Sequence, residues 1–478
     1  MSALDGAPAS EHRSPVRIVH LGLGSFHRAH QAWYTQHAGD GWGIASFTGR
    51  SPEAATRLST QDCRYTLLTR GAQGDRVETI DSIVQAHDGA DLGALRTLVS
   101  RPSTAVMTLT ITEAGYFVSR SGDDFSLKAQ EPSVAADLEV LRAANAQLSD
   151  VADGVLNTAP ARIVVGLAAR RAAGAGPLAL VSCDNLPRNG RALRAAVLAL
   201  AEASGPELAA WIQRNASFVD ASIDRITPRT VEADREAAAL LTGHADPCTV
   251  VTEPFSSWVL SGDFPAGRPA WERAGALFVE DLEPFENRKL WLLNGAHSLL
   301  AYAGLLRGHE TVAQAIADPV LRERTEALWD ADEAHLPAEG LDLPGYRAAL
   351  VERFTNACIE HRLEQIAADG SLKLGARVAP QLRRERAEGR LPEALMFPLA
   401  AWIAWLSERL TGPEAPGDVN DPALERLREA LNFEGSASTA AALRLVDPVL
   451  GADQELVRAL HLFRDEARNT APSAPAHV

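Results

Sequence analysis

The segment FENRKLWLLNGAHS holds the densest group of residues suited to acid–base chemistry. On an α-helix with Lys289 taken as zero, Glu286 falls at about 60°, His297 at about 80° and Asn294 at about 140°. All four side chains therefore share one face of the expected helix. Lys, Glu, Asn and His are uncommon together in a protein interior unless they are paired or functional.

This face suggests proton transfer to or from an alcohol. Burial lowers the pKa of a lysine, so Lys289 could take a proton from an alcohol or give one to a ketone. The Asn294 amide could donate to the oxygen on which negative charge develops. A structural interpretation is also open, in which Glu286, Arg288 and Lys289 form a surface ion-pair cluster and His297 is a core residue. Periodicity alone slightly favours the structural interpretation.

A second motif, IVHLGLGSFHRAH, places Gly22 and Gly24 between a β-branched run and a helix. Glycines let a strand turn tightly into a helix whose first N–H groups hold a pyrophosphate. The third glycine of G-x-G-x-x-G is replaced by His27. The acidic residue expected about 20 positions later is also absent, because the next apolar run ends in TGRS. Arg50 in that run could bind the 2′-phosphate of NADP or lie solvated at the surface.

These motifs sit in two different kinds of sequence. Apolar runs between Ala-rich segments predict parallel strands joined by helices; the runs are VRIVHLGLG, WGIASFTG, TAVMTLTIT and LALVSCDN. FVDASIDRITPR opens a less regular region that ends near PFENRKLW. Helical patterns follow in LNGAHSLLAYAGLL, LRERTEALWDADEAHL, YRAALVERFTNACIEHRLEQIAA and ALMFPLAAWIAWLSERL. We expect an α/β domain at 14–284, an all-α domain at 285–465 and a disordered tail at 466–478.

Composition limits the class of protein. A chain of 478 residues has room for two or three domains, and no apolar run approaches the ~20 residues of a membrane span. The net charge of -16 argues against a nucleic-acid binder. The first residues lack the pattern of a secretory signal, and the four cysteines lie far apart without the spacing of zinc ligands. We expect a cytoplasmic protein that needs no metal, while its oligomeric state is not indicated.

Six segments, in the same order, resemble the long-chain mannitol dehydrogenase family of polyol dehydrogenases and fructuronate and tagaturonate reductases. The segments, between about Val16 and Arg377, are GLGSFHRAH, TITEAGY, SCDNLPRNG, FVDASIDRITP, NRKLWLLNGAHSLLAYAG and RFTNACIEHRLEQIAADGSLK. The resemblance implies a Rossmann-like cofactor domain followed by a helical domain. It also implies metal-independent interconversion of a secondary alcohol and a ketone on an open-chain polyol, ketose or sugar acid. NAD is the cofactor it favours, with NADP as the alternative.

The resemblance assigns roles to individual residues. Lys289 resembles the family's catalytic lysine, and Asn185 and Asn294 resemble the pair that polarises the reacting oxygen. His297 resembles the residue that orients a neighbouring hydroxyl, and Glu286 the carboxylate that links the lysine to water. Further matching positions are Gly22, Gly24, Phe26, Arg28, Arg50 and Glu113 at the cofactor, and Asp224, Lys373 and Arg377 at the substrate.

One position bears on the substrate. Gln365 stands where mannitol-oxidising members tend to carry Arg, so the sequence looks closer to the fructuronate and arabinitol branches. A sugar-acid substrate would need a basic partner such as Lys373 or Arg377. A nucleotide-binding sensor that has kept the fold but lost catalysis is the competing interpretation, and the complete set of proton-transfer residues argues against it.

Overall fold

The computed structural model describes residues 13–144, 147–412 and 417–469. The chain divides into two compact units, Met1–Leu282 and Glu283–Val478. The division falls close to residue 285, where the sequence led us to expect the helical domain to begin.

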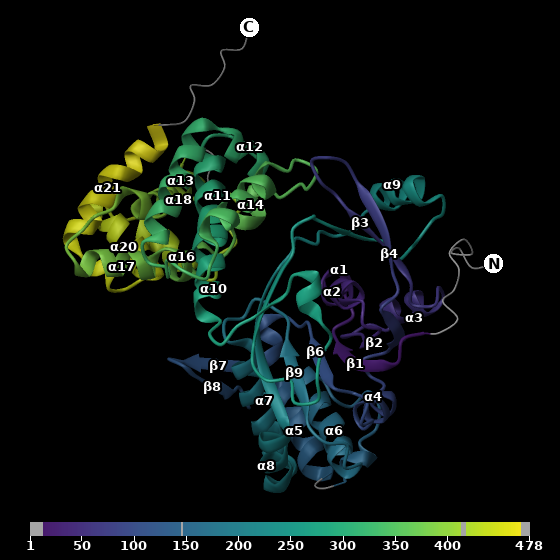
Figure 1. Cartoon of the computed structure of the whole chain (residues 1–478). Helices are drawn as coiled ribbons and strands as arrows, with labels where there is room; N and C mark the ends of the chain where they lie inside the picture. Colours follow the sequence, from purple (N-terminus) through teal and green to yellow (C-terminus); the bar gives the residue numbers. More distant parts are fainter. Residues whose placement is uncertain (1–12, 145–146, 413–416, 470–478) are drawn as a thin grey trace. The chain divides into compact units, whose positions relative to one another are not determined.

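An eight-stranded sheet forms the centre of the first unit (Figure 1). Its order is β13-β12-β10-β9-β6-β1-β2-β5, with bounds Leu277–Phe278, Ser257–Ser261, Ala216–Asp224, Leu178–Ser182, Val106–Leu109, Val16–Leu21, Gly43–Phe47 and Ile83–His87. Neighbouring strands pair parallel except β10 with β12. The run β5-β2-β1-β6-β9-β10 has the 3-2-1-4-5-6 order of dinucleotide-binding domains. The four strands expected from apolar runs, β1, β2, β6 and β9, are confirmed.

Strand β10 lies where the sequence predicted less regular structure, in the segment that begins FVDASID. These residues extend the parallel sheet next to β9. The strand was missed because polar residues, Asp220 and Ser222, alternate with its apolar ones and break the continuous run that marks its neighbours.

The sheet is covered on both faces, which explains why its central strands are continuous apolar runs. One core joins the strands to α4 (Leu92–Val99), α5 (Pro132–Ala144), α6 (Ala159–Ala172), α7 (Asn189–Ser204) and α8 (Pro206–Asn215). The opposite core contains α1 (Ser25–Ala29), α2 (Gln31–Ala38) and α3 (Glu53–Ser59). The remaining elements are β3 (Tyr65–Thr69), β4 (Arg76–Ile80), β7 (Val118–Ser121), β8 (Asp124–Leu127), β11 (Val250–Thr252), α9 (Glu232–Thr242), η1 (Glu113–Tyr116), η2 (Leu148–Asp150) and η3 (Trp271–Ala274).

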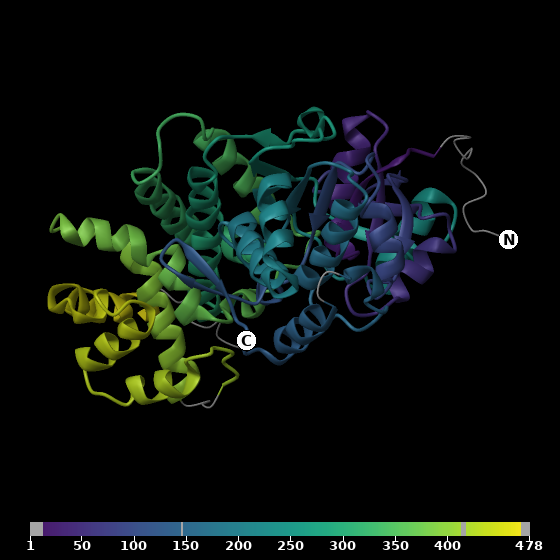
Figure 2. The same ribbon diagram turned by 90° about the horizontal axis from the view of Figure 1, so that it is seen from below.

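The second unit is a helical assembly around α18 (Glu393–Thr411), whose residues from Leu395 to Ser407 are all buried. Helices α11 (Ala296–Leu306), α13 (Pro319–Glu333) and α21 (Gln454–Asn469) pack against it (Figures 1 and 2). The others are α10 (Glu283–Arg288), η4 (Lys289–Gly295), α12 (Val312–Ala317), α14 (Leu343–Thr355), α15 (Leu363–Ala367), α16 (Gly370–Arg377), α17 (Ala379–Ala387), α19 (Leu424–Leu431), α20 (Ser436–Val446) and η5 (Leu450–Ala452).

Two helix boundaries differ from the sequence expectation. The helical pattern over 346–368 is interrupted, because α14 ends at Thr355 and α15 begins only at Leu363. Helix α21 continues to Asn469, so the first four residues of the expected tail are helical. The rest of that tail, 470–478, lies outside the described residues.

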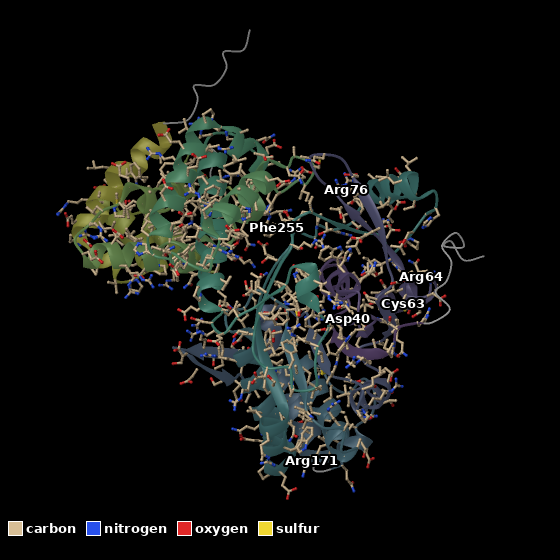
Figure 3. All side chains as sticks on the ribbon, viewed as in Figure 1. Asp40, Cys63, Arg64, Arg76, Arg171 and Phe255 are labelled. Carbon is tan, nitrogen blue, oxygen red and sulfur yellow. The ribbon has the colours of Figure 1, made fainter. Side chains whose placement is uncertain are left out.

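Within the described residues, no disulfide joins any of the four cysteines, and Cys63 is buried between α3 and β3 (Figure 3). In the same residues, no helix has the length and apolar character to cross a membrane. The described His, Cys, Asp and Glu residues form no group of three placed to hold a metal ion.

Candidate active site

The first unit gathers its candidate residues at one edge of the sheet. The parallel strands β1, β2, β6, β9 and β10 all end at this edge, which is where ligands bind in open α/β sheets. The candidates follow these strands in turn: Gly22, Gly24, Phe26 and Arg28 after β1, Arg50 after β2, Glu113 after β6, Asn185 after β9, and Asp224 as the last residue of β10.

The turn after β1 is shaped by two glycines with different constraints. Gly22 has φ +108°, and a Cβ there would lie 2.0 Å from the Thr110 carbonyl oxygen, so only glycine fits. At Gly24 a Cβ would meet no atom closer than 3.7 Å. The turn lies between β1 and β6, where the strand order reverses. A tight turn with room at its second glycine fits a dinucleotide phosphate at this switch point.

The missing third glycine is explained by a buried histidine network beneath the turn. His27 stacks on His20 with ring centroids 3.3 Å apart, and its ring nitrogens lie 3.0 Å from Ser46 Oγ and 3.3 Å from Gln31 Oε1. Burial holds the pKa of His27 well below its ordinary value, so the ring is neutral. His30 is likewise buried, with Nε2 3.0 Å from the Ser257 carbonyl oxygen. These histidines are core residues.

The two candidate phosphate-binding arginines differ in their surroundings. Arg28 donates to the carbonyl oxygens of Cys248, at 2.7 Å, and Gly24, at 3.3 Å, so its guanidinium holds the protein backbone. Arg50 is exposed just beyond β2, where a residue that contacts the adenosine ribose is expected. Glu113 is also exposed.

Asn185 lies exposed in a loop that buried neighbours hold in place. Asp184 accepts hydrogen bonds from the Tyr116 hydroxyl and, at 3.0 Å, from the Leu186 N–H. Burial raises the pKa of Asp184 to about 6. The Asn189 amide exchanges two hydrogen bonds with Ala221, of 2.8 and 2.9 Å, and so ties this loop to β10. Asp184 was not predicted from the sequence, although it lies two residues beyond the apolar strand β9.

The second unit places Lys289, Asn294 and His297 on one continuous helix, but not on a regular α-helix. Residues Lys289–Gly295 form a π-helical segment, η4, between α10 and α11. In a π-helix hydrogen bonds link residues five apart, so Asn294 lies about one turn beyond Lys289 and on the same side of the helix. The expected separation of about 140° was therefore wrong, and the shared face is narrower than predicted.

His297 is buried among basic side chains. Its ring lies 4.8 Å from Phe354 and 4.9 Å from His361, measured between centroids. Burial, helped by His361, Arg353 and more weakly by Arg377 and Lys373, holds the pKa of His297 well below its ordinary value. A neutral imidazole can donate one hydrogen bond and accept another. Glu286 and Lys289 are half-buried.

Both candidates on α16 contact the protein backbone. The Arg377 guanidinium donates to the Asn294 carbonyl oxygen at 3.1 Å and to Ser298 Oγ at 3.0 Å. Burial lowers its pKa to about 10. Lys373 Nζ donates to the Ile366 carbonyl oxygen at 3.1 Å, and burial, assisted by Arg377, lowers its pKa as well. The hydrogen bond to the Asn294 carbonyl oxygen therefore links Arg377 to the helix that carries Lys289.

Comparison with known proteins covers both units. Residues 16–273 match the model of the mannitol dehydrogenase Rossmann domain, and residues 281–461 match that of the mannitol dehydrogenase C-terminal domain. The chain belongs to the mannitol dehydrogenase family. The expectation of a Rossmann-like domain followed by a helical domain is confirmed.

Proteins similar to this chain are named for different compounds. The D-mannonate oxidoreductase of Escherichia coli K12 is 36% identical, covering 92% of this chain and 90% of its own length. A substrate-free D-sorbitol dehydrogenase structure has a TM-score of 0.84 at 28% identity, covering 95% and 94% of the two chains. The Pseudomonas fluorescens mannitol 2-dehydrogenase complex with NAD and D-mannitol has a TM-score of 0.75 at 34% identity, covering 96% and 92%.

Proposed function

We propose that this chain is an NAD-dependent oxidoreductase that interconverts a secondary alcohol and a ketone on an open-chain sugar acid. The observation that carries the proposal is the π segment, which starts at the candidate base Lys289 and brings Asn294 to the same side of the helix. Functional sites are where such segments commonly occur. NAD in the solved mannitol 2-dehydrogenase complex supports the cofactor assignment.

The proposed chemistry follows from the residues on this helix. NAD, when bound at the turn that Gly22 and Gly24 shape, would supply the hydride acceptor for this reaction. Lys289 in its neutral form removes the hydroxyl proton, and Glu286, one helical turn earlier, passes that proton to water. The Asn294 side-chain amide donates to the oxygen as negative charge develops on it. Asn185 is proposed for the same role, and His297 for binding a neighbouring hydroxyl.

A sugar acid is preferred over a neutral polyol because of the charge around His297. The cationic side chains Arg353, Lys373 and Arg377 all act electrostatically on its ring. Positive charge in a half-buried setting favours a carboxylate more than it favours a hydroxyl. The name of the E. coli relative, D-mannonate oxidoreductase, points to the same class of compound.

The test is a substrate panel with purified protein. D-mannonate, D-mannitol and D-arabinitol should be assayed for oxidation with NAD and with NADP. We expect kcat/KM for the acid with NAD to exceed the values for both polyols at least tenfold, which is about 1.4 kcal/mol. Greater activity on a polyol would refute the substrate class, and a kcat/KM about ten times higher with NADP than with NAD would refute the cofactor.

One variant distinguishes the loss of positive charge from a general loss of substrate binding. Arg353→Gln removes one positive charge next to His297 while keeping a long polar side chain. KM for the acid should rise several-fold, and KM for a slowly oxidised polyol should not change. An equal rise for both substrates would argue that no carboxylate is bound there.

A further inference from the structure

The π segment is braced by side chains from two other helices. Trp329 of α13 is buried and donates its indole N–H to the Leu292 carbonyl oxygen at 2.7 Å. Arg377 of α16 donates to the Asn294 carbonyl oxygen at 3.1 Å. Both acceptors belong to the π segment itself. The Trp329 ring also lies 6.2 Å from that of Phe354, which packs on His297.

These two hydrogen bonds can determine where along the helix the π segment lies. A π segment amounts to one extra residue within an α-helix, and the same extra residue could be accommodated at another place along the helix. Moving it past Asn294 would rotate that residue by about 100° relative to Lys289. Carbonyl groups in an irregular segment need hydrogen-bond donors, and a donor fixed in a neighbouring helix determines where the irregularity lies.

We propose that Trp329 is a positioning residue, whose indole N–H fixes the π segment between Lys289 and Gly295 and so keeps Lys289 and Asn294 on one side of the helix. Trp329 acts through the backbone at Leu292. This inference rests on the proposed function of Lys289 and Asn294. Nothing in the sequence pattern indicated this role for Trp329.

The decisive variant is Trp329→Phe, which removes the N–H and keeps an aromatic side chain. Because Asn294 acts on charge that develops during the reaction, kcat should fall about tenfold or more in both directions, as for the loss of an oxyanion donor. KM for the substrate should change less than twofold, and NADH affinity should not change. A kcat within twofold of wild type would overturn the proposal.

Trp271→Phe provides the matched control. Trp271 is also buried, and its Nε1 donates to Thr35 Oγ1 at 3.1 Å in the core of the first unit. The same hydrogen-bonding group is lost in both variants, so kcat should remain near wild type in Trp271→Phe. Equal losses of kcat in the two variants would show that any buried indole matters, and would overturn the specific role of Trp329.

A second replacement guards against misfolding of Trp329→Phe. β-(3-Benzothienyl)alanine at position 329 keeps the shape of the bicyclic ring and replaces the N–H by sulfur. The same fall in kcat is expected, and wild-type kcat would overturn the proposal. Lys289→Ala distinguishes failure of the positioning role from failure of the proposed function. If it abolishes turnover while both changes at 329 leave kcat intact, the positioning role fails and the proposed function stands. If Lys289→Ala keeps more than about a tenth of wild-type kcat, the proposed function itself fails.

Discussion

Lys289 is the first residue of the π segment and the proposed acid–base group. Lys289→Ala should lower kcat by roughly 10² to 10⁴, the range that positioned proton transfer supplies. Alcohol oxidation needs the neutral amine, so its rate should rise with pH in the wild type while ketone reduction falls. Steady-state kinetics in both directions would measure this. An ion-pair lysine would instead cost at most about 1 kcal/mol of stability, so a variant with more than about a tenth of wild-type kcat argues against the role.

Gly22 is the residue on which the turn after β1 depends most directly. Gly22→Ala places a methyl group 2.0 Å from the Thr110 carbonyl oxygen at φ +108°, so we expect a loss of more than about 1 kcal/mol in unfolding free energy and weaker NADH binding. Urea unfolding and fluorescence titration would measure the two effects. Gly24→Ala is the control for stability, because φ there is -133° and the added methyl group has room.

His20 and His27 make the first unit sensitive to acid. Burial lowers the pKa of His20 to about 3 and that of His27 well below 6.5. Below pH 6.5 the unfolded chain takes up protons that the folded core does not. The free energy of unfolding therefore decreases as the pH is lowered. Each group contributes about 1.4 kcal/mol per pH unit until its folded pKa is reached.

Urea unfolding between pH 7.5 and 5 would measure the slope. In His20→Gln, the slope of the unfolding free energy against pH should decrease by the contribution of one histidine. An unchanged slope in this variant would show that His20 is protonated in the folded protein.

At the scale of elements, the helix with the π segment packs against a buried acid on α13. A Cβ on Gly295 would lie 3.8 Å from Asp332 Oδ2, and Gln381 Nε2 donates to Asp332 Oδ1 at 3.0 Å. Burial raises the pKa of Asp332 well above its ordinary value of 3.8. Above pH 3.8 the unfolded chain releases this proton and the folded protein keeps it, so the acid destabilises the fold increasingly as pH rises.

Asp332→Asn should therefore raise the melting temperature at pH 7, because the amide carries no charge to desolvate. The gain should shrink towards pH 4, where wild type pays no such penalty. Thermal unfolding of both proteins over this range would test it. A lower melting temperature of the variant at pH 7 would mean that Asp332 is ionised and stabilised by its surroundings.

At the scale of the whole molecule, both units match the family, and the proposed chemistry assigns proton transfer to a lysine. A lysine base makes a zinc-bound alkoxide unnecessary. Turnover should therefore survive exhaustive dialysis against a chelator. Loss of activity on dialysis, with recovery on addition of zinc, would contradict the lysine mechanism.

Local sequence patterns predicted the α/β and helical domains and the group of Glu286, Lys289, Asn294 and His297. Strands β1, β2, β6 and β9 are buried on both faces, so each is a continuous apolar run that periodicity detects. Strand β10 was missed because its polar residues break that run. The resemblance supplied Asn185 and Asp224, which no local pattern singled out.

Only the tertiary structure decided how the site helix is wound. The 7 residues of the π segment are too few for apolar periodicity to distinguish it from an α-helix, so Lys289 and Asn294 were expected about 140° apart. The difference depends on donors far away in the chain. Trp329 lies 37 residues from Leu292, and Arg377 lies 83 residues from Asn294. Because hydrogen bonds from α13 and α16 fix the backbone of η4, its conformation follows from packing and not from local sequence.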